Sequence, residues 1–303
     1  GLSFESFVIE RWMRERDVFV SAAKELGAEV NVQNANGDVE EQISQIEYFI
    51  KKQVDVIVVV AGDCEALSDV MIKAREAGIK TVSYDRLIMN AGCDLYISFD
   101  NTEVGRLMAE SMLENIPDGG DIFLIQGPLT DNNVSLIREG IDETLAGSNL
   151  NVVYEANCPG WIAENAYTYT KEGLKLDRNV KGIICGNDDL ASQAFRALSE
   201  ERLAGKVCVT GQDGDLAACQ RIVEETQEMT AFKSVEQEAS LAAKCAVLLG
   251  LGEEIEEVQD TAYDGTYNVP YLELQPIAVT KENMDEVIIK GGFHAKEDVY
   301  LNV

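Results

Sequence analysis

The chain has 303 residues, of which 46% are hydrophobic, and a formal charge of −29 from 54 acidic and 25 basic side chains. This length is sufficient for two domains of ordinary size, each with its own core. The negative charge repels nucleic-acid phosphates and anionic membrane surfaces, so these partners are excluded and a neutral or cationic small molecule is favoured as ligand. No apolar run approaches the roughly 20 residues that cross a bilayer.

Apolar strands alternate with amphipathic helices along the whole chain. After a strand-like opening at residues 1–4, a helix is predicted at 17–27, in which Val18, Ala22 and Leu26 recur at helical spacing. A second helix is predicted at 40–52 on the same grounds. Further strands are predicted at residues 28–33, 55–60, 79–84, 121–126, 181–186, 206–211 and 229–233. Strands that are apolar on both faces and alternate with helices predict an α/β fold with parallel sheets.

A long-period repeat indicates two similarly built halves. Residues 27–63 and 149–188 both show a strand, a polar loop, a helix, a short link containing valine and a buried strand, at nearly the same spacing. A repeat of this length predicts two α/β lobes rather than a solenoid. Ligands of open α/β sheets gather beyond the carboxyl ends of the strands. The expected binding site is therefore a cleft formed by those ends.

Polar side chains follow several predicted strands at the point where each strand ends. Together they both donate hydrogen bonds to hydroxyl groups and accept them. Residues 131–133 also precede a predicted helix at 134–145, so N-capping of that helix is an equal alternative for them. The candidates at the strand ends are Asp85, Arg86, Asp131, Asn133, Asn187, Asp213 and Lys233.

Where a neighbouring residue is predicted to cap the following helix, the candidate itself is not needed as a cap and can face a ligand. Asp188 and Asp189 are predicted to cap the helix that begins there, which leaves Asn187 for a ligand. Asp215 is the alternative cap to Asp213 for the next helix. Ser234 with Gln237 forms a predicted capping box, which does not account for Lys233.

The chain contains two tryptophans, Trp12 and Trp161, and each lies where a loop enters a helix. A place in the core is the ordinary alternative for a tryptophan. Neither residue lies within an apolar run, however, and both neighbour the polar candidates. Flat rings that stack on C–H faces, together with Asp, Asn and Arg side chains that bind hydroxyls, are typical of a sugar site.

Several longer motifs carry a resemblance to a known family. They are ERWMRERD, NANGDVEEQISQIE, YDRLI, YISFDNTEVG, DNN, GWIAENA, GQDGDLA and GGFH. Over essentially the whole chain they resemble the type I periplasmic sugar-binding proteins of bacterial ABC importers, and within that family the D-xylose binders. The resemblance implies two doubly wound parallel-sheet lobes, joined by a three-strand hinge, that close on one sugar. It implies sugar contacts at Arg11, Asp85, Arg86, Asp131, Asn133, Asn187, Asp213 and Lys233, and stacking rings at Trp12 and Trp161.

The resemblance also implies how the charges and the lobes act. Asp85 would accept hydrogen bonds from sugar hydroxyls while Arg86 donates them, and each charge would offset the burial cost of the other. The expected N-terminal lobe comprises residues 1–104 and 235–274, and the expected C-terminal lobe 105–234 and 275–303. The implied location is extracytoplasmic, in the periplasm or anchored by lipid to the cell surface.

The implied function is capture of a monosaccharide, D-xylose or a glucose-like aldopyranose, for an ABC permease. A sugar-sensing ectodomain that signals to a membrane histidine kinase would have the same kind of site and is the alternative. The effector-binding core of a transcriptional repressor is disfavoured, because no helix-turn-helix precedes the lobes and the chain is acidic.

Neither an enzyme nor a cofactor is predicted. The single histidine, His294, is far in sequence from the candidate carboxylates, and no nucleophile elbow, G-x-G-x-x-G or H-E-x-x-H motif is present. The seven cysteines are scattered, without C-x-x-C spacing, so no metal site is expected. Their odd number leaves at least one thiol unpaired, which is unusual in an oxidising compartment.

Overall fold

The computed structural model describes residues 1–258 and 260–303. The chain forms two compact units. The first comprises Gly1–Asp100, Thr130–Asn133 and Ser234–Leu274, and the second comprises Asn101–Leu129, Val134–Lys233 and Gln275–Val303. These ranges differ from the lobes expected from the sequence mainly at Thr130–Asn133. This short segment lies with the first unit because Asp131 and Asn133 bond to Arg86 and Asp85.

The first unit contains a seven-stranded sheet in the order β11-β12-β5-β4-β3-β1-β2. Neighbouring strands are parallel except for the antiparallel pair β11 and β12. Its strands are β1 (Leu2–Phe4), β2 (Val32–Asn34), β3 (Val56–Val60), β4 (Lys80–Tyr84), β5 (Leu95–Phe99), β11 (Asp260–Tyr263) and β12 (Asn268–Leu274). Parallel strands buried on both faces explain why the runs are apolar without alternation.

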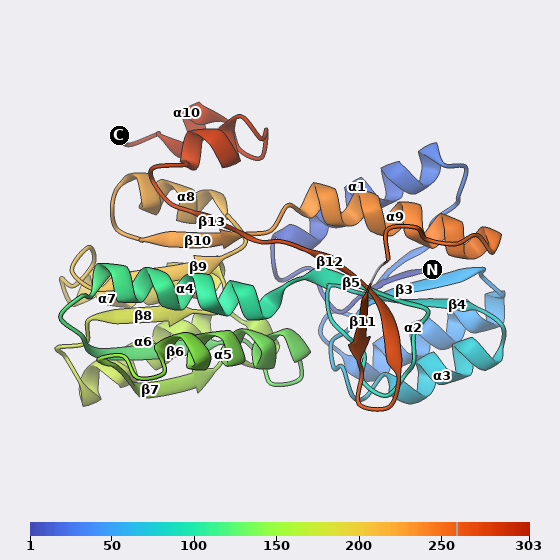
Figure 1. Ribbon diagram of the computed structural model, residues 1–303, viewed down its shortest axis with the longest axis horizontal. Coiled ribbons are helices and arrows are strands. Elements are labelled where there is room, and N and C mark those ends of the chain that lie inside the picture. The colour runs from blue at the N-terminus through green and yellow to red at the C-terminus, as the bar shows by residue number, and fades with distance from the viewer. Residues whose placement is uncertain (259) are drawn as a thin grey trace. The chain divides into compact units, whose positions relative to one another are not determined.

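Helices cover both faces of this first sheet (Figure 1). Helices α1 (Arg11–Glu25) and α9 (Val235–Leu251) pack together along one face, and α2 (Val39–Lys52) and α3 (Ser68–Glu76) lie along the other. The core between the sheet and the second helix pair includes Ile46 and Phe49 of α2, Met71 of α3, and Ile57 and Val59 of β3. Apolar residues at helical spacing on α2 are therefore explained by contact with the sheet.

The second unit contains a six-stranded sheet in the order β13-β10-β9-β8-β6-β7, parallel except for β13. Its strands are β6 (Gly120–Gln126), β7 (Leu150–Asn157), β8 (Gly182–Cys185), β9 (Cys208–Gln212), β10 (Met229–Phe232) and β13 (Ile277–Val279). Its helices are α4 (Asn101–Asn115), α5 (Asn132–Leu145), α6 (Glu164–Leu176), α7 (Asp188–Glu200), α8 (Leu216–Val223) and α10 (Lys296–Val299), with a 3₁₀ turn at Pro159–Trp161 and a π turn at Asp285–Ile289.

Two glycines explain how α4 and α5 approach each other so closely. A Cβ added at Gly105 would lie 2.0 Å from the carbonyl oxygen of Ile137, and one added at Gly140 would lie 2.0 Å from that of Thr102. Only glycine fits at this crossing. Met108 and Met112 of α4 then pack in the core of the second unit.

The predicted α/β class with two mainly parallel sheets is confirmed, and each predicted strand overlaps an observed one, although the strand predicted at 28–33 is found only at Val32–Asn34. The two repeats correspond to β2-α2-β3 and β7-α6-β8, which occupy equivalent positions in the two sheets. Helix α1 begins at Arg11, six residues before the predicted start. Among the described residues, no helix combines the length and hydropathy needed to cross a membrane. All seven cysteines are free thiols.

Candidate ligand-binding site

Asp85 and Arg86 lie in a tight turn directly after β4. Asp85 has a φ of +63°, in the left-handed region that L-residues rarely adopt. Its carbonyl oxygen accepts hydrogen bonds from the Ser98 hydroxyl at 2.6 Å and from the Asn133 amide at 3.1 Å. Its own N–H donates to the carbonyl of Ile97. These bonds hold the turn, so the chain reverses immediately after the buried strand.

The side chain of Asp85 is buried in a network of charged groups. It lies 3.1 Å from the Arg11 guanidinium, and Asn133 Nδ2 donates to it at 3.0 Å. Arg11, the first residue of α1, also pairs with Glu15 one turn later and with Glu238 of α9 at 2.8 Å. Burial raises the pKa of Glu15 to about 7, although the Arg11 charge opposes this shift.

Arg86 is equally buried, and its guanidinium contacts carboxylates from two other segments. It lies 2.9 Å from Asp131 and 3.2 Å from Glu5, which follows β1, and it donates to the carbonyl of Ala61 at 2.8 Å. Burial disfavours the charged form of Arg86, but Asp131 and Glu5 outweigh it and raise the pKa above the ordinary value.

Burial lowers the pKa of Arg86, and Asp131, Glu5 and Asp85 all raise it, so Asp85 does offset the burial of Arg86 as expected, although less than the other two carboxylates. Arg11 and Asn133 bind the Asp85 side chain, whereas Asp131 and Glu5 bind Arg86.

Trp12 brings an aromatic ring to this cluster. The Arg11 guanidinium lies 4.4 Å from its ring centroid and the Arg86 guanidinium 5.4 Å, so the ring contacts both cations. Trp12 is almost fully buried, yet its Nε1 has no hydrogen-bond partner among the described residues. The ring thus belongs both to the core, as the alternative interpretation expected, and to the polar cluster.

In the second unit, Trp161 ends the 3₁₀ turn at Pro159–Trp161 with a φ of +57°. A Cβ added at Gly127, just after β6, would lie 2.2 Å from its ring, and one at Gly186, after β8, would lie 3.2 Å away. The ring therefore packs across the carboxyl ends of β6 and β8, the edge at which a ligand was expected.

Asn187, which follows β8 through Gly186, corrects a prediction about capping. Its side-chain oxygen accepts from the Leu190 N–H at 2.9 Å, so Asn187 and not Asp188 or Asp189 is the N-cap of α7. The cap forms because Asn187 is extended whereas Asp188 is already helical and fully buried. Capping uses only the oxygen. The Asn187 Nδ2 group is buried and has no partner among the described residues.

Asp213 and Lys233 follow β9 and β10 and are both buried. Asp213 has a φ of +103°, and its N–H donates to the carbonyl of Ala231 on β10 at 3.0 Å. Ser234 caps α9 as predicted, by accepting from the Gln237 N–H, whereas Asp215 stands at the N-cap position of α8 without a capping hydrogen bond from its side chain. The second unit thus places Trp161, Asn187, Asp213 and Lys233 after neighbouring strands of one sheet.

Several polar groups beside the candidate residues were missed by the sequence reasoning. Glu5 follows β1 and was detectable as another strand-end residue, and Glu15 was detectable as an i+4 partner of Arg11. Glu238 gave no local signal. Gln126 and Gln212 end β6 and β9, and the side-chain oxygen of each is buried without a partner within the described part of the chain.

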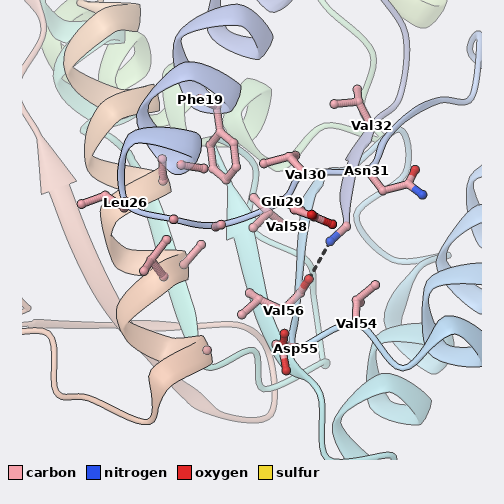
Figure 2. Close-up of a pocket in the computed structure, with 18 of the residues that line it drawn as sticks. Phe19, Leu26, Glu29, Val30, Asn31, Val32, Val54, Asp55, Val56 and Val58 are labelled. Carbon is pink, nitrogen blue, oxygen red and sulfur yellow. Dashed lines mark hydrogen bonds between the residues drawn. The ribbon is translucent and has the colours of Figure 1, made fainter.

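The opposite edge of the first sheet contains a hollow of about 1060 Å³ (Figure 2). It is lined largely by aliphatic side chains such as Val30, Val56 and Leu26, at the amino ends of the strands. The hydrogen bond drawn in it joins main-chain groups, the Gly1 ammonium and the carbonyl of Val56. Because a sugar needs convergent polar side chains, this hollow does not match the predicted ligand.

Comparisons with known proteins agree with this arrangement. A family model described as periplasmic binding protein domain matches residues 1–254. A "D-xylose-binding periplasmic protein" of Haemophilus influenzae is 44% identical over 99% of this chain and 91% of its own length. A protein of the same name from Escherichia coli is 40% identical over 99% of this chain and 92% of its own.

A solved structure shows the same fold. The solute-binding protein of an ABC transporter from Clostridium phytofermentans, with bound β-D-glucose, superposes with a TM-score of 0.90 at 26% identity, over 99% of each chain. The family match and the periplasmic names of the relatives agree with the extracytoplasmic location predicted from the sequence. The chain belongs to the periplasmic binding protein family, within its type I sugar-binding branch, and is a binding protein rather than an enzyme.

Proposed function

We propose that this protein captures a monosaccharide for an ABC importer and that the sugar is D-xylose. The observation that carries the choice of sugar is the pair of relatives at 44% and 40% identity, both named as D-xylose-binding proteins and both matched over 99% of this chain. The glucose-bound structure at 26% identity supports the broader class of aldopyranoses.

The chemistry of the two units supports a neutral polyhydroxy ligand. In the first unit, Arg11 and Arg86 donate while Asp85 and Asp131 accept, which suits hydroxyl groups that do both. In the second unit, the buried amide of Asn187 has a donor to spare. The excess of carboxylates and the formal charge of −29 disfavour a phosphorylated or acidic sugar.

We propose further that the residues predicted from the sequence contact this sugar. Their support is their position at the carboxyl ends of strands, their burial, and the presence of one tryptophan in each set. The first set lies in one bonded cluster, and the second lies along the ends of β6 to β10. The proposed contacts are Arg11, Trp12, Asp85, Arg86, Asp131, Asn133, Trp161, Asn187, Asp213 and Lys233.

The membrane partner is part of the proposal. An ABC permease is the expected partner, and a sensor histidine kinase is the alternative expected from the sequence. Co-purification of the protein with membrane components, with and without D-xylose, distinguishes them, since a kinase recovered in place of a permease would assign a sensing role.

Isothermal titration with D-xylose, D-glucose, D-ribose and a xylose phosphate tests the ligand. D-Xylose is expected to bind most tightly and the phosphate not to bind. Asp85→Asn should weaken D-xylose binding by about 10- to 100-fold, because a charge-assisted hydrogen bond contributes roughly 1.5–3 kcal/mol. Asp69→Asn, an exposed aspartate of α3, serves as the control and should bind as the wild type does. Tighter binding of the phosphate than of any free sugar would refute the proposal.

A further inference from the structure

Asp188 is a fully buried carboxyl group of the second unit that lies outside the predicted sugar contacts. One oxygen, Oδ2, accepts hydrogen bonds from the N–H of Gly214 at 2.9 Å, the N–H of Asp215 at 3.1 Å and the hydroxyl of Thr230 at 2.8 Å. The other oxygen, Oδ1, accepts from Gln227 Nε2 at 3.0 Å. A single side chain therefore ties the start of α7 to the turn after β9 and to β10.

The surroundings of Asp188 are built to hold a carboxyl group. A Cβ added at Gly211 on β9 would lie 2.1 Å from Oδ1, so a side chain there would displace the group. The buried Arg221 donates to Gln227 Oε1 at 3.0 Å and to the Ser192 hydroxyl at 2.8 Å, which places a positive charge next to the network. Buried polar groups that are fully bonded in this way fix one arrangement of the segments that they join.

The segments joined by Asp188 are those that carry the proposed sugar contacts. Asp188 directly follows Asn187, and Gly214 directly follows Asp213. Thr230 lies on β10, which ends one residue before Lys233. The main-chain groups that the Asp188 carboxyl binds are the N–H groups of Gly214 and Asp215, so a shift of this carboxyl would act most directly on the turn that follows Asp213.

Asp213 depends on this support more than its neighbours do, because its φ of +103° is unfavourable for an aspartate. Such a backbone costs on the order of 1–3 kcal/mol and persists only where the surroundings fix it. Asp188 binds the two N–H groups that follow Asp213, and His294 Nε2 lies 2.8 Å from the carbonyl oxygen of Gly214. The turn at 213–215 is thus held at the N–H groups of Gly214 and Asp215 and at the carbonyl oxygen of Gly214.

We propose that Asp188 is a positioning residue for sugar binding: its carboxyl group fixes the turn at 213–215 and thereby the direction of the Asp213 side chain relative to Asn187. This inference rests on the proposed function, since Asp213 must contact the sugar for its direction to matter.

Titration with D-xylose by calorimetry, on the full chain, tests the proposal. Asp188→Asn should weaken binding by about 10-fold, since it removes an acceptor from the turn while keeping the size of the side chain. Asp213→Ala should weaken binding by about 100-fold through loss of a charge-assisted contact. The double variant should be no weaker than Asp213→Ala alone, because Asp188 acts through Asp213.

A matched control separates this role from loss of stability. Leu145→Ala removes a core side chain of α5 in the same unit, away from the network, and should lower the unfolding temperature without changing the affinity for D-xylose. If Asp188→Asn does not fold, Thr230→Val removes one donor to the carboxyl group with little change of shape, and it should weaken binding about 3-fold.

The outcomes distinguish the two proposals. If the wild-type protein binds no sugar, the proposed function fails and this role fails with it. If the wild type binds D-xylose and the folded Asp188 or Thr230 variant binds equally well, only the positioning role is refuted. Multiplied losses in the double variant would refute it too, because they would show that Asp188 acts independently of Asp213.

Discussion

In the first unit Arg86 is held at its strand end by ion pairs between side chains, whereas in the second unit Asp213 lies in a turn whose main-chain N–H groups are bound by the Asp188 carboxyl. The two sheets have equivalent strand orders: β5-β4-β3-β1-β2 in the first corresponds to β10-β9-β8-β6-β7 in the second. After β4, Arg86 is fixed by Asp131 and Glu5. After β9, Asp213 has a left-handed backbone, as Asp85 has after β4, and the Asp188 carboxyl binds the two N–H groups that follow it.

This difference shows that one topology can present a polar edge in two ways. Removing one member of a buried ion pair costs free energy of folding, because the other charge is left buried without its partner. A fixed turn places the cost of a substitution in the main-chain conformation instead. Substitutions in the first unit should therefore reduce both stability and binding, and substitutions in the second should act more selectively on binding.

The largest expected effect is that of Arg86→Met. It leaves the buried carboxylates of Asp131 and Glu5 without their cation, which should lower the free energy of unfolding by about 3–5 kcal/mol. Chemical denaturation measures this loss. The control is Arg138→Met in the second unit, whose ion pairs with Asp142 and Glu155 are partly open to solvent and should contribute little. Equal losses in the two variants would remove the proposed contrast between the units.

Trp161→Ala should weaken D-xylose binding by about 100-fold while the chain stays folded, because the buried ring packs against Gly127 and Gly186 at the carboxyl ends of β6 and β8. Calorimetry gives the affinity and circular dichroism the fold. Ile162→Ala changes the exposed neighbouring side chain and should bind normally. An unfolded Trp161→Ala variant would show that the alternative interpretation, a core tryptophan, was correct.

The pH dependence of stability involves one carboxyl group in each unit. Burial raises the pKa of Glu15 and of Asp188 to about 7, from 4.5 and 3.8. A raised pKa in the folded state means that the stabilisation is complete below about pH 4 and is lost as the pH rises through 7. Between pH 6 and 8, each group should reduce the free energy of unfolding by about 1 kcal/mol.

Denaturation at several pH values tests both groups. Glu15→Gln and Asp188→Asn should each flatten the slope between pH 6 and 8, and the double variant should flatten it further. Glu297→Gln, an exposed glutamate of α10, should leave the slope as it is. An unchanged slope in Glu15→Gln would show that Arg11 keeps the glutamate ionised in the folded protein.

The sequence was sufficient for the fold and for the strand-end residues, because apolar runs and their polar exits are local signals. Local signals did not predict contacts between residues that are distant in the sequence. Glu238 lies 227 residues from Arg11, and nothing near it indicates the pairing. They also failed at Asn187, because the choice among consecutive capping residues depends on where the helical backbone begins. The left-handed turn at Asp85 had no glycine to reveal it.

The smallest expected effect concerns the turn at Asp85, the counterpart in the first unit of the turn at Asp213. Ser98→Ala removes the hydroxyl that donates to the Asp85 carbonyl at 2.6 Å. Asn133 still donates to the same oxygen, and the Asp85 side chain keeps its pair with Arg11. Binding of D-xylose should therefore weaken only about 2-fold, less than the loss expected for Thr230→Val at the Asp213 turn.

The comparison of these two serine and threonine variants is the finest test of the contrast between the units. Both lose one hydroxyl near a left-handed aspartate, so a difference in charge does not enter. Ser68→Ala, which removes an exposed hydroxyl bonded to the carbonyl of Asn90, controls for the general cost of the substitution. If Ser98→Ala weakens binding as much as Thr230→Val does, the turn rather than the ion pairs orients Asp85. Both units would then hold their binding residues through the main chain.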